Sequence, residues 1–136
     1  MKLQILSDTH NSKYSISEQA DVIIHAGDFS NRLSGAIEFA EKCKSLNKKF
    51  IFVLGNHDYY SSNYSSVVNF LKENYPENAL LDDNHIKIQD KIFVGGTLFT
   101  NFRSNSPLTS PRYFYSPKKM LNNRFMILIK SWLAVI

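Results

Sequence analysis

A chain of 136 residues suits a single domain, and a chain of this size buries roughly two-thirds of its unfolded surface on folding. Apolar residues make up 43% and charged residues 21% of the sequence, which excludes a wholly disordered or fibrous protein. The net charge is +4, yet all twelve acidic residues lie at or before Asp90, so residues 91–136 form a basic third that would attract anions or serve as a solvated face.

Cysteine usage and the N-terminus bear on the cellular compartment. Cys43 is the single cysteine, which excludes an intrachain disulfide and a zinc site built from several thiolates. The first ten residues, MKLQILSDTH, turn polar too early for a secretory signal, and no apolar run reaches the ~18 residues of a membrane span. We expect a cytoplasmic protein with no membrane partner.

Three predicted strands each run into a polar loop. Residues 2–6 alternate in the manner of a strand, residues 21–26 form a β-branched run, and residues 50–54 are apolar throughout, as in a strand covered on both faces. Apolar residues at helical spacing predict a helix over 34–46 between the second and third strands. The alternation predicts an α/β fold with a mainly parallel sheet.

The second half of the chain is less regular. We expect a helix over 65–74 and two strands at 85–89 and 91–94, with one domain covering 1–136. Residues 101–118 contain serines and prolines without periodicity, which is typical of a flexible loop. Residues 119–136 could form a helix, although they end on an apolar run more typical of a core segment.

The polar loops after the three strands carry metal-ligand chemistry. Asp8 and His10 follow the first strand, Asp28 follows the second, and Asn56-His57-Asp58 follow the third. Ligands of open α/β sheets bind beyond the carboxyl ends of the strands, where these groups would converge. Carboxylate, imidazole and amide oxygen suit Mn²⁺, Fe²⁺ or Zn²⁺. The alternative is that Asn56 and Asp58 cap the following helix and His57 is an exposed loop residue.

Three motifs, in order, resemble the first signature blocks of the calcineurin-like metallophosphoesterases: Ser7-Asp8-Thr9-His10, Gly27-Asp28 and Gly55-Asn56-His57-Asp58. The resemblance covers roughly residues 2–100 and implies a β-α-β scaffold that is part of a four-layer αββα sandwich. It also implies a phosphatase or phosphodiesterase that uses two divalent ions and a water or hydroxide held between them.

The resemblance assigns a role to each motif residue. Asp8 and His10 would hold the first ion, Asp28 would bridge both ions, and Asn56 would hold the second. His57 would donate a proton to the leaving oxygen or position the phosphate, with Asp58 orienting its ring. Arg32 would grip the substrate phosphate, although GDFSNR differs from the Gly-Asp-x-Val-Asp-Arg pattern of the Ser/Thr-phosphatase branch.

The later histidines of the family have no counterpart here. The remaining histidines are His25, which we expect to be an interior or edge group, and His85, which opens a predicted strand. Residues 96–102 and 122–125 resemble a bacterial and phage subgroup whose further histidines lie downstream. We therefore expect a chain that is truncated or frameshifted near residue 126, a weakly occupied second site, and doubtful full activity.

The alternative function is a catalytically incomplete remnant that binds phosphate-rich ligands such as nucleic acid. Aromatic side chains in RYFYSPKK, residues 112–119, could stack on bases while the cations follow phosphates. The same composition also describes a flexible insertion or lid. The sequence leaves the substrate, the metal and the oligomeric state open.

Overall fold

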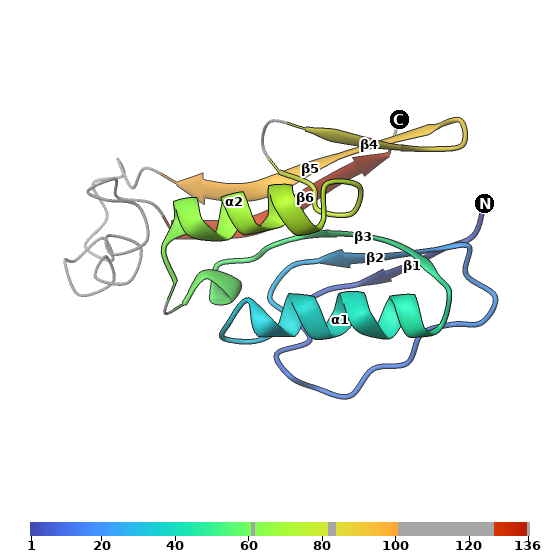
Figure 1. Cartoon of the computed structure of the whole chain (residues 1–136), viewed down its shortest axis with the longest axis horizontal. Helices are drawn as coiled ribbons and strands as arrows, with labels where there is room; N and C mark the ends of the chain where they lie inside the picture. The colour runs from blue at the N-terminus through green and yellow to red at the C-terminus, as the bar shows by residue number, and fades with distance from the viewer. Residues whose placement is uncertain (61, 82–83, 101–126, 136) are drawn as a thin grey trace.

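The computed structural model describes residues 1–60, 62–81, 84–100 and 127–135. A parallel sheet of order β1-β2-β3 occupies the N-terminal half (Figure 1). Its strands are β1 (Leu3–Leu6), β2 (Val22–Ala26) and β3 (Lys49–Val53), and helix α1 (Ser34–Ser45) connects β2 to β3. The predicted strand, strand, helix and strand of this half are confirmed within one or two residues.

A second sheet follows the helical part of the chain. A short 3₁₀ turn, η1 (His57–Tyr59), leads to helix α2 (Tyr64–Asn74), whose first turn is capped by the Asn63 side chain. Strands β4 (His85–Ile88), β5 (Lys91–Thr100) and β6 (Ile127–Val135) then form an antiparallel sheet of order β4-β5-β6. The chain is therefore a mixed α/β protein, as predicted.

The expected helix over 119–136 is wrong where the structure describes this segment. Residues 127–135 form strand β6, which pairs antiparallel with β5. Isoleucine and valine fit a pleated strand, and the long edge of β5 offers hydrogen bonds that a single-sequence pattern does not reveal. The expected loop at 101–118 lies outside the described residues.

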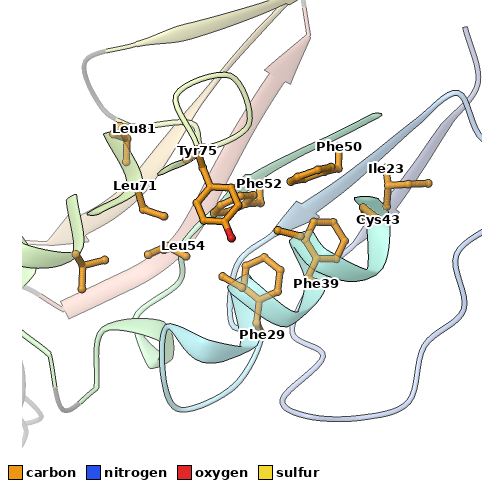
Figure 2. Packing of buried hydrophobic residues seen from close by; sticks show 14 of the residues in the cluster. Ile23, Phe29, Phe39, Cys43, Phe50, Phe52, Leu54, Leu71, Tyr75 and Leu81 are labelled. Atoms are coloured by element: carbon orange, nitrogen blue, oxygen red, sulfur yellow. The ribbon is translucent and has the colours of Figure 1, made fainter. Parts of the chain in front are cut away.

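Side chains of the parallel sheet alternate between two apolar cores. On β3, Phe50 and Phe52 face a cluster with α1 and α2, whereas Ile51 and Val53 face the second sheet and pack with its Phe93. Figure 2 shows the first cluster, where Phe39 and Cys43 of α1 lie against the sheet. The described layers are thus helices, parallel sheet and antiparallel sheet, three consecutive layers of the expected sandwich.

No helix among the described residues is long and apolar enough to reach across a lipid bilayer.

Candidate metal centre

The polar loops after β1 and β2 are aligned by backbone hydrogen bonds that continue the parallel ladder beyond the strands. Asp8 N–H donates to the Gly27 carbonyl at 3.0 Å, and His10 N–H donates to the Asp28 carbonyl at 3.1 Å. A third bond joins Asn11 N–H to the Phe29 carbonyl at 2.9 Å. The parallel register of β1 and β2 therefore fixes where Asp8, His10 and Asp28 meet.

These three residues bring one ligand atom each to within 4.8 Å of the others. Asp8 and His10 are exposed and Asp28 is half-buried, so an ion could reach them from solvent. The two carboxylates and the imidazole are a donor set that suits Mn²⁺, Fe²⁺ or Zn²⁺. The residues present fit a divalent metal, as the sequence predicted for this part of the site.

The backbone at the cluster adopts the left-handed conformation that non-glycine residues rarely occupy. The φ angles are 51° at Asp8, 42° at His10, 64° at Asn11 and 57° at Asp28. Such positions cost on the order of 1–3 kcal/mol each and persist only where the surroundings determine them. The cost supports a functional reason for placing these ligands here.

The buried Asp58 carboxylate holds the β2 and β3 loops together. It accepts hydrogen bonds from the backbone N–H groups of Asp28 at 2.8 Å, Phe29 at 2.9 Å, Ser30 at 3.3 Å and Gly55 at 2.8 Å. Burial raises the pKa of Asp58 to about 7, opposed by the N–H donors of Gly55, Ser30 and Asp28 and reinforced by the negative charge of Asp28. Asp58 is therefore a bridge between loops.

Gly55 lets the β3 loop approach Asp28 closely. A Cβ atom at this position would lie 2.1 Å from Asp28 Oδ1 and 2.5 Å from Asp28 N. A positive φ is found at Gly27, at 91°, where a glycine is needed for the turn. The reason for glycine at 55 is therefore its close contact with a candidate ligand.

The expected pairing of Asp58 with the His57 ring is wrong. His57 Nδ1 lies 2.7 Å from Asn31 Oδ1, whereas the hydrogen bonds described for the Asp58 carboxylate all come from backbone N–H groups. Since an amide oxygen only accepts, Nδ1 carries the proton and Nε2 remains available. The His57 ring also lies edge-on to His10, with centroids 4.8 Å apart, so it borders the cluster.

His25 lies beneath the cluster, as an interior group. It is fully buried, stacks on Phe29 with centroids 3.6 Å apart, and places Nε2 3.1 Å from the Thr9 hydroxyl. Its Nδ1 has no hydrogen-bond partner among the described residues. Burial lowers the pKa of His25 to about 4, with a smaller opposing effect from Asp8, so the ring is neutral near pH 7.

The remaining predicted residues occupy different places. Asn56 precedes η1, and its Nδ2 donates to the Tyr60 hydroxyl at 3.2 Å. His57 N–H donates to Asp28 Oδ1 at 3.0 Å, which ties this turn to the cluster. Arg32 is exposed on the turn before α1, where its N–H donates to Ser30 Oγ. No contact joins Arg32 to Asp28 among the described residues, so its phosphate role stays a prediction.

His85 is separated from the cluster. It lines a hollow of about 540 Å³ together with Lys48 and Lys49, at the end where β3 begins. The candidate ligands follow the opposite end of the strands.

Sequence reasoning missed three supporting residues: Thr9, Asn31 and Tyr60. Each contacts a histidine or an asparagine of the site, namely His25, His57 and Asn56. Asn31 stands in the GDFSNR segment already noted for Arg32, and Tyr60 follows the GNHD block by two positions. Their positions in or beside the three motifs could have indicated these residues. The direction of each side chain, however, depends on tertiary packing.

The fold and the cluster define an α/β domain with a candidate metal site at the edge beyond its parallel strands. The family model described as calcineurin-like phosphoesterase matches residues 1–134, and the chain therefore belongs to the calcineurin-like phosphoesterase family. Members of this family are metal-dependent phosphoester hydrolases.

A curated relative is the "Uncharacterized protein L509" of Acanthamoeba polyphaga mimivirus. It is 29% identical over 110 residues, which cover 72% of this chain and 39% of the relative. The matched part of the chain thus spans well under half of that relative's length. No solved structure matches the chain.

Proposed function

We propose that this chain supplies the metal-binding part of a phosphoester hydrolase that acts on phosphomonoesters or phosphodiesters. The observation that carries the proposal is the convergence of Asp8, His10 and Asp28 ligand atoms within 4.8 Å of one another. The family match gives this cluster its chemical context.

The proposed ligand sets use the residues of the three motifs. Asp8 and His10 would hold the first ion, Asp28 would serve both ions, and Asn56 would hold the second. When bound, divalent ions would lower the pKa of coordinated water to roughly 7 and neutralise charge on the phosphoryl oxygens. The second ion has fewer protein ligands in this set, so we expect it to bind more weakly.

His57 is the proposed proton donor to the leaving oxygen. Its Nδ1–H donates to Asn31 Oδ1 and its ring lies beside His10, so in the imidazolium form Nε2 carries the proton that is transferred. Asn31 keeps the ring in one orientation, the role first expected of Asp58. Arg32, exposed and close in sequence to Asp28, is proposed to contact a substrate phosphate.

The test is hydrolysis of p-nitrophenyl phosphate and bis(p-nitrophenyl) phosphate with Mn²⁺. Asp28→Ala should lower kcat/KM by about 100-fold or more, since the proposed bridging ligand is lost. Asp90→Ala is the matched control, because Asp90 is an exposed carboxylate paired with Lys91 in the β4-β5 turn. Hydrolysis that survives both a chelator and Asp28→Ala would refute the proposal.

The alternative of nucleic-acid binding concerns the basic third of the chain. Its aromatic segment at 112–119 lies outside the described residues, so the proposal rests on the cations and on the absence of acidic residues after Asp90 in the sequence. Single-stranded oligonucleotide should then bind with an affinity that falls steeply with salt. Salt-independent binding, or none at low salt, would argue against it.

A further inference from the structure

Tyr60 lies against two residues of the metal edge. Its hydroxyl oxygen is 3.2 Å from Asn56 Nδ2, and its ring lies 4.7 Å from the His57 ring with an interplanar angle of 39°. Tyr60 is half-buried: it packs against the apolar cluster of the α1 face and keeps part of its side chain exposed. None of the three sequence motifs includes it.

The turn η1 brings Asn56 and Tyr60 together. Tyr59 N–H donates to the Asn56 carbonyl at 3.3 Å, and Tyr60 N–H donates to the His57 carbonyl at 3.1 Å. These bonds fold the backbone so that side chains four residues apart meet. The same turn is fixed to Asp28, because His57 N–H donates to Asp28 Oδ1. Asn56 is therefore held by contacts within η1, and the neighbouring His57 fixes that turn to Asp28.

An asparagine ligand presents a problem that an aspartate ligand does not. The amide has one oxygen that can hold a cation and one NH₂ group that cannot, so the orientation of the amide decides whether it binds metal. A hydroxyl can donate or accept, and it therefore permits either orientation. A cation at Oδ1 selects the orientation in which Nδ2 donates to Tyr60, and polarises the amide so that this bond becomes stronger.

We propose that Tyr60 is a positioning residue for the second metal ion, because its hydroxyl holds the Asn56 amide with Oδ1 directed to the ion. The inference rests on the proposed function, in which Asn56 is a ligand of that ion. Tyr60 itself binds no metal. Its ring supports His57 separately, through the contact between the two rings.

The first experiment measures Mn²⁺ binding to the full chain by calorimetry, with no substrate present. Tyr60→Phe removes the hydroxyl and keeps the ring, so the affinity of the second ion should fall by about 10-fold, as for other outer-shell ligand partners, while the first is unchanged. Tyr75→Phe is the control, because Tyr75 is a buried tyrosine of the α-helical core. Equal second-site affinity in Tyr60→Phe and wild type would overturn the inference.

A second pair of variants separates the inference from the function beneath it. Asn56→Asp supplies two equivalent oxygens and needs no amide orientation, so Tyr60→Phe should have little further effect in the Asn56→Asp background. An equal loss in both backgrounds would show that the hydroxyl does not act through the amide. Asn56→Ala must weaken the second ion; if it does not, the two-ion function fails, whatever Tyr60→Phe does.

The ring contact is tested by NMR of the His57 imidazole. Tyr60→Leu should shift the His57 ring resonances strongly, whereas Tyr60→Phe should leave them near their wild-type positions. Identical spectra for wild type and Tyr60→Leu would contradict the support of His57 by the ring.

Discussion

The apolar cluster on the α1 face of the parallel sheet and the polar edge beyond its strands are built from neighbouring residues, yet they obey different rules. Phe29 is 3% exposed and packs in the core, whereas Asp28, one residue earlier, is half-buried with a φ of 57°. The edge residues adopt left-handed backbone conformations that their residue types disfavour, and the core residue Phe29 does not. The difference indicates that packing beneath the edge holds the backbone where the ligands need it.

Two residues connect these regions. Asp58 has no exposed surface and binds the backbone of Asp28, Phe29, Ser30 and Gly55, and His25 reaches from the core to Thr9 in the first loop. Both are polar groups buried under the edge. If the comparison is right, substitutions in the core should change stability, and substitutions at the edge should change metal binding.

The largest expected effect on stability is in the core, at Phe52. Phe52 is 1% exposed and contacts the rings of Phe29 and Tyr75 at centroid distances of 5.9 and 5.8 Å. Phe52→Ala should lower the free energy of unfolding by about 3–5 kcal/mol in a urea titration. Mn²⁺ affinity of the folded variant should stay close to that of wild type. A tenfold loss of affinity with intact folding would show that core and edge are not separable.

The control for Phe52 is Ile5→Ala on β1. Ile5 is 65% exposed, so its truncation should change the free energy of unfolding by no more than about 0.5 kcal/mol.

A second prediction concerns a steric clash introduced at the polar edge. In Gly55→Ala the new Cβ would meet Asp28 Oδ1 and Asp28 N, so the variant should lose about 1–3 kcal/mol of stability and bind Mn²⁺ much more weakly. Gly35→Ala is the matched control, since its Cβ would meet Ser30 Oγ at 2.7 Å and no candidate ligand. Unchanged Mn²⁺ affinity in Gly55→Ala would remove Asp28 from the binding site.

A third prediction uses the buried His25. Its pKa is about 4 in the folded chain and 6.5 ordinarily, so the unfolded state binds more protons between these values and His25 lowers stability as pH falls through the window. The raised pKa of Asp58 acts in the opposite direction, because there the folded state binds more protons. Replacement of His25 therefore isolates its contribution.

The measurement compares wild type with His25→Gln in urea titrations from pH 7 to pH 4. The stability difference should move in favour of the variant by at most about 1.4 kcal/mol per pH unit as pH falls. His85→Gln, at an exposed histidine, is the matched control. A pH-independent difference for His25→Gln would mean that the ring is charged without cost in the folded protein.

The smallest effect is expected at Asn31. Loss of its hydrogen bond in Asn31→Ala should change stability by about 1 kcal/mol or less, since both groups can contact water. It should also redistribute the neutral His57 tautomers away from Nδ1–H, as read from ¹⁵N chemical shifts of the imidazole. Unchanged tautomer populations would leave His57 without the orientation proposed for it.

Sequence patterns predicted the helices and strands whose own residues show the spacing of apolar side chains typical of that element. The strands around Ile23 and Ile51 and helix α1 follow from β-branched runs and helical spacing, and the three loops with Asp8, Asp28 and Asn56 follow from polar residues placed after them. Strand β6 was not predicted, because its conformation depends on pairing with the edge of β5. A strand gains its hydrogen bonds from a partner, whereas a helix makes its own.

At the site, the sequence by itself determined which residues carry ligand chemistry and near which strand ends they stand. Tertiary structure decided which partners they have: Asn31 rather than Asp58 beside His57, Tyr60 beside Asn56, and Asp28 close against Gly55. The contacts of Asn31 with His57 and of Asp28 with Gly55 join residues from different loops, and the contact of Tyr60 with Asn56 depends on how the η1 turn is folded. The left-handed backbone at Asp28 is likewise not specified by residue type. The residue type at each position is given by the sequence alone, but the direction of a side chain depends on the residues that pack around it.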